Sequence, residues 1–251
     1  MKSFGLQLYT LRDYMQDEPS IQKAMTTVKK LGYSHVQVYG SLDLSLKMGM
    51  EAKNAGLDVL GTTGSFDEFI NNPKKTIEIH KQLGAKEIGI GGYHYNNTSD
   101  IESFIEKANN FADFVYKNGF KFSYHNHSHE FIRYENGKTA FEMLSEGLNH
   151  ESISFVLDTY WVQHGGGDVR YWIEKLKNRI SILHLKDMKR GAEQSEFAEI
   201  GIGNMYWDGI IKTAEECGVK NFVVEQDISE NPFDSIKISS EYITENFINR
   251  R

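Results

Sequence analysis

The sequence contains one cysteine, three prolines and no long hydrophobic run. A single thiol, Cys217, excludes an intramolecular disulfide and a cysteine-based zinc cage, and it indicates a reducing compartment. About 18 consecutive apolar residues are needed to cross a bilayer, and no segment meets this requirement, so no membrane partner is expected. Arg12 and Asp13 interrupt the first apolar segment, which argues against a signal peptide and for a cytoplasmic protein.

The sequence also lacks an excess of positive charge. It has 35 acidic and 28 basic side chains, which gives a formal net charge of −7. A nucleic-acid partner is held mainly through its phosphates by basic side chains, so no such partner is expected. Linkers rich in proline, serine or glycine are missing as well, and 251 residues is a common length for one α/β barrel. We therefore expect a single domain, 1–251.

A junction recurs along the chain: a helix-like run, a glycine and then a short apolar run. Glycine just after a helix adopts the left-handed conformation that ends it. The junction glycines are Gly32, Gly56, Gly84, Gly119 and Gly218. Two further junctions without glycine lie in the last gap, at 150–158 and 177–187. A strand and a helix repeated in this way are typical of βα units around a parallel sheet.

Eight apolar segments fit the strands of these units, and amphipathic helical patterns separate them. The segments are 4–9, 34–39, 57–62, 86–91, 120–126, 153–158, 180–185 and 220–225. A closing helix follows the last one. Eight such units predict an α/β fold, the (β/α)8 TIM barrel. A doubly wound open sheet is the rival, but the glycine loop of dinucleotide-binding folds is missing after the first strand.

Polar side chains gather where the predicted strands end, which is the functional face of such a barrel. Asp158, His184 and Glu225 are hard to place in apolar strands unless a cation or hydrogen bonds compensate them. Taken with Glu130, they offer three carboxylates and one imidazole to a divalent ion. Mn²⁺ is the first choice for this set, with Mg²⁺, Co²⁺, Zn²⁺ and Fe²⁺ as alternatives.

Each ligand has an ordinary alternative. A single carboxylate at a strand end commonly caps the next helix, which suits Asp187 and Asp227 more than Asp158. A single histidine is commonly a hydrogen-bonded core residue. At the fifth strand, His125 or His127 could replace Glu130 as the ligand.

Several motifs carry a family resemblance, and they occur in order along almost the whole chain. They are GLQLYTLRD (5–13), YHNHSHEF (124–131), LDTYW (157–161), HLKD (184–187), a GxGxxxW segment (201–207) and VEQD (224–227). Together they resemble the xylose isomerase-like TIM-barrel superfamily of sugar phosphate isomerases and epimerases, which also includes endonuclease IV and inosose dehydratase. The resemblance implies a divalent metal held by Glu130, Asp158, His184 and Glu225.

The resemblance also implies roles for residues around the metal. A metal-stabilised enediolate of a keto sugar would form, with Glu130 and Glu225 moving protons on its two faces. His125 and His127 could contact substrate hydroxyls or shuttle protons, and Lys186 could stabilise an oxyanion. Side chains for stacking on the sugar are Tyr9 and Trp161, with ordinary packing as their alternative.

The predicted function is therefore a metal-dependent isomerase or epimerase of a keto sugar or sugar derivative. The alternative is a lyase or dehydratase that uses the same site for 3-keto-glycoside cleavage or inosose-type dehydration. An endonuclease would need more histidine ligands, and a non-catalytic sugar-binding protein would not need two opposed glutamates. The glycines of 165–167 and 201–203 could hold a phosphate or simply form turns. The expected partner is a small carbohydrate, and the oligomeric state stays open, with a homodimer or larger assembly as options.

Overall fold

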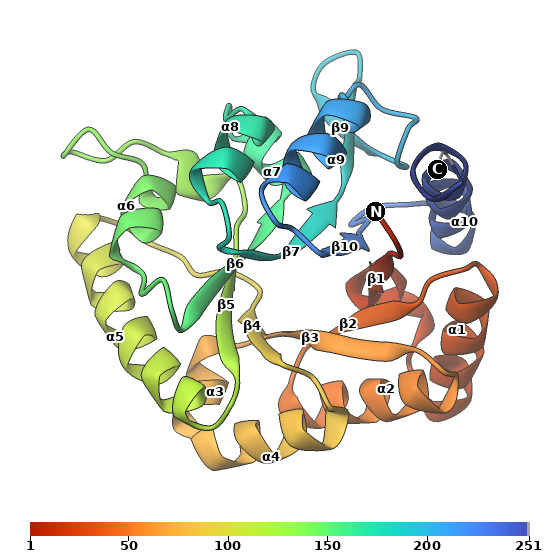
Figure 1. Ribbon diagram of the computed structural model, residues 1–251, viewed down its shortest axis with the longest axis horizontal. Helices are drawn as coiled ribbons and strands as arrows, with labels where there is room; N and C mark the ends of the chain where they lie inside the picture. The colour runs from red at the N-terminus through yellow and green to blue at the C-terminus, as the bar shows by residue number, and fades with distance from the viewer. Residues whose placement is uncertain (250–251) are drawn as a thin grey trace.

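Short buried strands alternate with helices in the computed structural model, which describes residues 1–249 (Figure 1). Eight strands close into a parallel barrel, in the order β1-β10-β7-β6-β5-β4-β3-β2. They are β1 (Gly5–Gln7), β2 (His35–Tyr39), β3 (Asp58–Gly64), β4 (Glu87–Ile90), β5 (Lys121–His125), β6 (Ile153–Asp158), β7 (Ile180–Leu185) and β10 (Asn221–Val224). The predicted (β/α)8 barrel is confirmed, and each predicted strand range overlaps an observed strand.

The helices surround the barrel, as Figure 1 shows. They are α1 (Glu18–Lys30), α2 (Leu42–Asn54), α3 (Phe66–Asn71), α4 (Pro73–Leu83), α5 (Thr98–Lys117), α6 (Ala140–Gly147), α7 (Thr159–His164), α8 (Val169–Lys175), α9 (Trp207–Glu216) and α10 (Pro232–Ile243). Local sequence sets their ends. Asp17 and Ser20 form a capping box at the start of α1, and Gly84 ends α4 with a left-handed φ of 72°.

Two segments differ from the sequence-based expectation. The first strand ends at Gln7, because the Gln7 side chain accepts a hydrogen bond from Tyr9 N and starts the 3-10 helix η1 (Leu8–Tyr14). After β7, the chain forms an antiparallel hairpin of β8 (Asp187–Arg190) and β9 (Ser195–Ala198). The hairpin strands read DMKR and SEFA, which are mostly polar and largely unburied, so no apolar segment marks them in the sequence.

The core has two layers. Inside the barrel, Val156, Ile182 and Val223 pack with the partly buried Leu60. A much larger cluster fills the space between the strands and the inward faces of the helices. Burying one such aliphatic or aromatic side chain stabilises the fold by roughly 1.5–3 kcal/mol, so these layers hold the strand ends rigidly in place.

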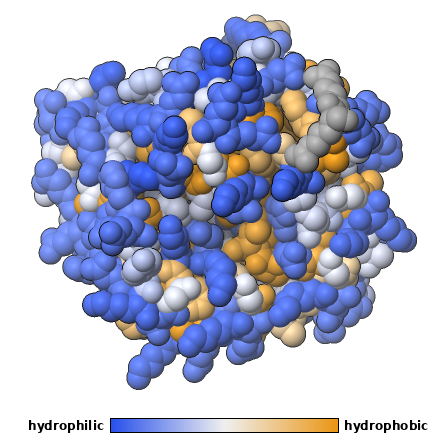
Figure 2. All heavy atoms as spheres, viewed as in Figure 1, coloured by the Kyte–Doolittle hydropathy of each residue, from blue (hydrophilic) through white to orange (hydrophobic). Residues whose placement is uncertain are grey.

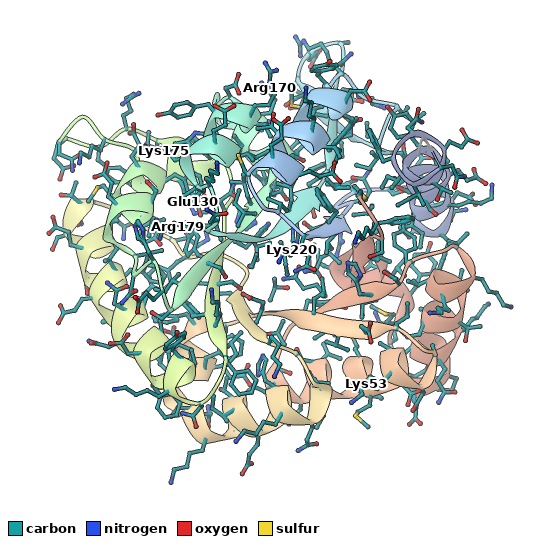
Figure 3. All side chains as sticks on the ribbon, viewed as in Figure 1. Lys53, Glu130, Arg170, Lys175, Arg179 and Lys220 are labelled. Atoms are coloured by element: carbon teal, nitrogen blue, oxygen red, sulfur yellow. The ribbon has the colours of Figure 1, made fainter. Side chains whose placement is uncertain are left out.

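The outer surface is mainly polar. Figure 2 shows hydrophilic side chains around the edge of the face in view, and Figure 3 shows charged side chains on the helices, such as Lys53 on α2 and Arg170 on α8. Within residues 1–249, no helix combines the length and the apolar character needed to cross a lipid bilayer.

Candidate metal centre

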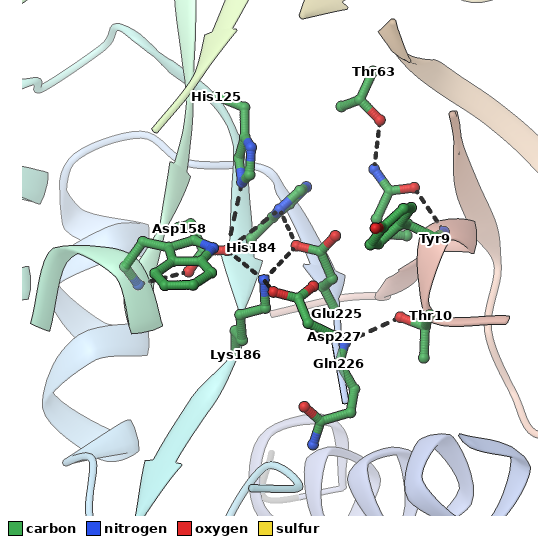
Figure 4. A network of polar contacts seen from close by, with 12 residues as sticks. Tyr9, Thr10, Thr63, His125, Asp158, His184, Lys186, Glu225, Gln226 and Asp227 are labelled. Carbon is green, nitrogen blue, oxygen red and sulfur yellow. Dashed lines mark hydrogen bonds and ion pairs between the residues drawn. The ribbon is translucent and has the colours of Figure 1, made fainter. Parts of the chain in front are cut away.

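Four ligating side chains meet at the carboxyl ends of neighbouring strands. His125 ends β5, Asp158 ends β6, His184 lies near the end of β7, and Glu225 directly follows β10. One ligand atom from each lies within 4.8 Å of the others, and all four residues are buried (Figure 4). The strands β5, β6, β7 and β10 are consecutive in the barrel, so their parallel register brings these ends together.

The orientation of His184 fits a metal ligand. Its Nε2 lies 2.6 Å from Gln37 Oε1, an atom that can only accept, so the ring donates from this side. Nδ1 then faces Glu225 Oε2 at 3.0 Å and Asp158 Oδ2 at 3.8 Å. Nδ1 is buried and forms no hydrogen bond of acceptable geometry within the described residues. A shared cation would satisfy this nitrogen and both oxygens, and the Gln37 contact is the second partner that metal-bound histidines usually have.

Lys186 lies beside the same carboxylates. Its side chain is only 1% exposed, and Nζ lies 3.2 Å from Asp158 Oδ2, 3.0 Å from Glu225 Oε2 and 2.8 Å from Asp227 Oδ2. Three carboxylates and one ammonium leave a formal charge of two negative units. One divalent cation would cancel that charge, so the donor set and its charge both fit a divalent metal.

The electrostatics of the cluster follow from burial and close opposite charges. Burial lowers the pKa of Lys186, but the surrounding carboxylates outweigh it and raise this pKa well above its usual value. Burial likewise opposes ionisation of Asp158 and Glu225, yet Lys186 holds the pKa of both well below their usual range. For His184, Glu225 and Asp158 overcome burial and raise the pKa to about 9 in the metal-free chain.

Glu130 is not part of this cluster. His125 lies beside Asp158, His184 and Glu225, where the sequence analysis expected Glu130. The 3-10 helix η2 (His129–Phe131) turns the Glu130 carboxylate into the protein, where it is fully buried. Oε1 accepts a hydrogen bond from Tyr124 Oη (2.7 Å), and Oε2 accepts one from the His127 backbone N (2.8 Å). The structure thus brings together three of the four predicted ligands, Asp158, His184 and Glu225. The fourth member of the cluster is His125, one of the two histidines that the sequence offered in place of Glu130.

Asp158 serves both the cluster and the fold. Its Oδ1 caps α7 by accepting from Trp161 N at 3.0 Å, while Oδ2 faces the cluster. The capping alternative and the metal alternative are therefore compatible for this residue, because each uses a different oxygen.

A cavity of about 530 Å³ opens above the cluster. Its lining includes Tyr9, His125, His127, Lys186 and Glu225, all of which the sequence had singled out. The remaining lining residues are Gln7, Arg12, Tyr39, Gly40, Thr63, Gly91, His184, Asp227 and Ile228. A cavity of this size with polar groups at its base is typical of a small-molecule site.

His127 and Trp161 lie next to each other at the edge of the cluster, with ring centroids 5.3 Å apart. Burial lowers the pKa of His127 to about 3, so its imidazole is neutral near pH 7. Its Nδ1 is buried and has no hydrogen-bond partner within the described chain. Trp161 is not among the lining residues of the cavity, and its ring lies 5.2 Å from Lys186 Nζ.

Comparison with known families agrees with the barrel fold. Residues 27–245, most of the chain, match the family described as xylose isomerase-like TIM barrel. The chain belongs to this family.

The sequence is similar to that of an inosose dehydratase from Mesomycoplasma hyopneumoniae, a curated relative that is 22% identical over 193 residues. The match covers 68% of this chain but only 63% of the relative, less than two thirds of its length. A sugar phosphate isomerase/epimerase from Parabacteroides distasonis has a similar structure, with a TM-score of 0.81, 26% identity and coverage of 98% and 95% of the two chains. A Mycobacterium smegmatis barrel in complex with magnesium has a TM-score of 0.74, 14% identity and coverage of 98% and 96%, which shows the shared fold.

In this xylose isomerase-like barrel, Arg12 and Asp227 are two charged residues of the cavity lining to which sequence reasoning gave no site role. Arg12 donates to the backbone oxygens of Tyr9 (3.0 Å) and Asp227 (2.8 Å), which ties η1 to the segment after β10. Asp227 was predicted as a helix cap but contacts Lys186. Both belong to quoted motifs, GLQLYTLRD and VEQD, and their position within those motifs was the available signal.

Proposed function

We propose that the protein is a divalent-metal-dependent isomerase that moves a proton between adjacent carbons of a keto sugar or keto-sugar derivative. The observation that supports this is the buried cluster of His125, Asp158, His184 and Glu225 at the base of a cavity. Its two imidazoles and two carboxylates suit Mn²⁺, Fe²⁺, Co²⁺ or Zn²⁺ better than Mg²⁺, and Mn²⁺ remains our first choice. When bound, the ion supplies a Lewis acid that polarises a carbonyl and a neighbouring hydroxyl of the substrate.

Glu225 is the proposed base. Lys186 keeps its carboxylate ionised, and the residue lines the cavity. Oε2 contacts Lys186 and His184, whereas Oε1 forms no hydrogen bond with any described residue. Oε1 can therefore accept the proton from the carbon next to the carbonyl and return it to the neighbouring carbon.

His127 and Lys186 complete the proposed proton-transfer site. The neutral imidazole of His127 can donate a hydrogen bond to a substrate oxygen without bringing a charge. The ammonium of Lys186 can stabilise the oxyanion that forms when the carbon loses its proton. Isomerisation needs a base on one face only, which suits a cavity that Glu130 does not reach. The two-glutamate epimerisation predicted from the sequence would require Glu130 to leave its buried hydrogen bonds.

Elimination is the second candidate, and a specific arrangement favours it. Asp227 and Lys186 form an ion pair of 2.8 Å beside Glu225, so a base and a proton donor line the same part of the cavity. Glu225 would take the proton, the electrons would form a carbon–carbon double bond, and the β oxygen would leave as water or an alcohol with a proton from Lys186. The inosose dehydratase relatives support this reading.

Metal analysis coupled to deuterium uptake tests the proposal. Purified protein should hold about one divalent ion per chain, and keto sugars incubated in D₂O should gain deuterium at one carbon. EDTA should abolish the exchange. An unchanged product mass apart from deuterium indicates isomerisation, whereas loss of water or an alcohol indicates elimination.

Two matched glutamate variants sharpen the test. Glu225→Gln should fold, bind metal weakly and lose more than about 1000-fold in exchange rate, as expected for a catalytic base. Glu130→Gln removes a glutamate that is not among the lining residues of the cavity and should lose less than about tenfold. Equal losses in both variants, or full turnover by metal-stripped protein, would contradict the assignment.

A further inference from the structure

The turn between β9 and α9 has the composition of an anion-binding loop. It contains Gly201 and Gly203 and leads into the N-terminus of α9. In (β/α)8 barrels, phosphate groups commonly bind the loops after the seventh and eighth strands, where backbone N–H groups and a helix N-terminus converge. The sequence left open whether this turn holds a phosphate.

A carboxylate of the chain itself fills the turn. Asp187 is fully buried, and its Oδ2 accepts hydrogen bonds from Gly201 N (2.9 Å), Gly203 N (3.2 Å) and Trp207 Nε1 (2.7 Å). Its Oδ1 accepts from Met188 N (2.7 Å) and Met205 N (3.3 Å). The donors that would hold a phosphate are therefore already used by an internal anion.

The glycines of the turn are explained by the same contact. A Cβ added at Gly203 would lie 2.3 Å from Asp187 Oδ1 and 2.6 Å from Met188 O. Gly201 has a φ of +87°, which side chains other than glycine rarely adopt. The motif thus allows the backbone to approach Asp187.

The cations of the cavity are also paired internally. Arg12 and Lys186 are the arginine and lysine among its lining residues. Arg12 donates to two backbone carbonyls, and Lys186 contacts three carboxylates. Glu225 and Asp227 add negative charge to the lining. In the metal-free chain, a phosphate dianion entering this cavity would meet repulsion from these carboxylates, whereas a bound divalent cation would offset their charge. Among the described lining residues, the arginine and the lysine both have internal partners, so neither is held ready for a phosphate.

We propose that the substrate is an uncharged carbohydrate that carries no phosphate group. This inference rests on the proposed function and narrows its substrate class. The lining groups that remain available suit hydroxyls and sugar C–H faces, since Tyr9 and Tyr39 pack edge to face with ring centroids 5.4 Å apart and Thr63 lies beside Gln7.

Thermal unfolding in inorganic phosphate tests the filled turn. The Tm of the wild-type protein should be the same in phosphate and in chloride at equal ionic strength. Asp187→Ala should unfold roughly 5–10 °C lower, and phosphate should restore part of that loss because it can occupy the emptied turn. Asp168→Ala is the matched control: it removes an exposed carboxylate that caps α8 through Tyr171 N (2.9 Å), and phosphate should not restore its Tm.

Two results would overturn the inference. One is a phosphate-specific rise in the wild-type Tm, and the other is a folded Asp187→Ala variant that phosphate does not stabilise. If that variant does not fold, the wild-type measurement still decides, together with binding of a ketose and its phosphate ester. Metal-loaded wild-type protein should bind D-fructose at least tenfold more tightly than D-fructose 6-phosphate.

Deuterium exchange separates this inference from the proposed function. Exchange into phosphate esters but not into the free ketoses would overturn the inference and leave the proposed isomerase chemistry standing. If neither class exchanges, the proposed function fails, and the phosphate unfolding experiment still decides whether the turn is closed to anions.

Discussion

Lys186 offsets part of the negative charge of the buried carboxylates when no metal is bound. Its ammonium contacts the same Asp158 and Glu225 oxygens that face His184. Each of these charges is costly to bury alone, so stability of the metal-free chain depends on keeping the group together. A bound metal ion would also neutralise these carboxylates. The contribution of Lys186 to the free energy of unfolding should therefore depend on whether metal is bound.

Replacing Lys186 by Met should therefore destabilise the protein strongly only when metal is removed. In EDTA we expect the free energy of unfolding to fall by about 3–5 kcal/mol, because carboxylates are left buried without a partner. Adding a divalent metal should restore much of this loss, as measured by urea unfolding. Lys189→Met, which removes an exposed partner of Glu196, should change stability by less than about 0.5 kcal/mol in either condition. A metal-independent loss for Lys186→Met would contradict this account.

Among the elements, the hairpin β8–β9 and the turn that follows it shape one side of the functional face. Tyr160 of α7 stacks on Phe197 of β9 with ring centroids 4.2 Å apart, which joins the hairpin to the helix that Asp158 caps. Asp187 begins β8 and organises the turn before α9. The hairpin therefore packs on α7 through Tyr160 and Phe197, and it is joined to the following turn by the buried Asp187 carboxylate.

Gly203→Ala should weaken this arrangement. The added methyl would collide with Asp187 Oδ1 and Met188 O, and relief of such overpacking costs about 1–3 kcal/mol. We expect the urea midpoint to fall accordingly. Gly91→Ala is the control, since a Cβ there meets no atom within 4 Å and should leave the midpoint almost unchanged. Equal midpoints for the two variants would show that the turn adapts freely.

For the whole molecule, the closed barrel places groups far apart in sequence into one buried environment. His80 of α4 illustrates this outside the functional site. Its Nδ1 donates to Thr76 O (2.7 Å), and its Nε2 lies 2.9 Å from Thr62 Oγ1 of β3. Burial lowers its pKa to about 4, so the folded chain keeps His80 neutral in mildly acidic solution.

Stability should consequently fall as the pH drops from about 6.5 to about 4. In this window the unfolded chain binds a proton at His80 that the folded chain does not. The free energy of unfolding therefore falls by about 3 kcal/mol in total by the time the pH reaches about 4. Urea unfolding of wild type and His80→Gln across this range should show a flatter dependence for the variant. The control Gln163→Ala changes an exposed residue that does not titrate, and it should keep the wild-type slope. Parallel curves for wild type and His80→Gln would contradict the assignment.

The sequence alone was sufficient for the barrel and for most of the cluster, because both follow from periodicity. Eight strand-sized apolar segments spaced by amphipathic helices favour a parallel barrel. The closed barrel brings Asp158, His184 and Glu225 to one face, because each lies at the carboxyl end of its strand. Only the tertiary structure shows that His125, and not Glu130, lies beside Asp158, His184 and Glu225. The position of Glu130 depends on how a three-residue 3-10 helix turns its carboxylate toward Tyr124. Likewise, the closure of the glycine turn by Asp187 depends on distances between segments that no periodic pattern encodes.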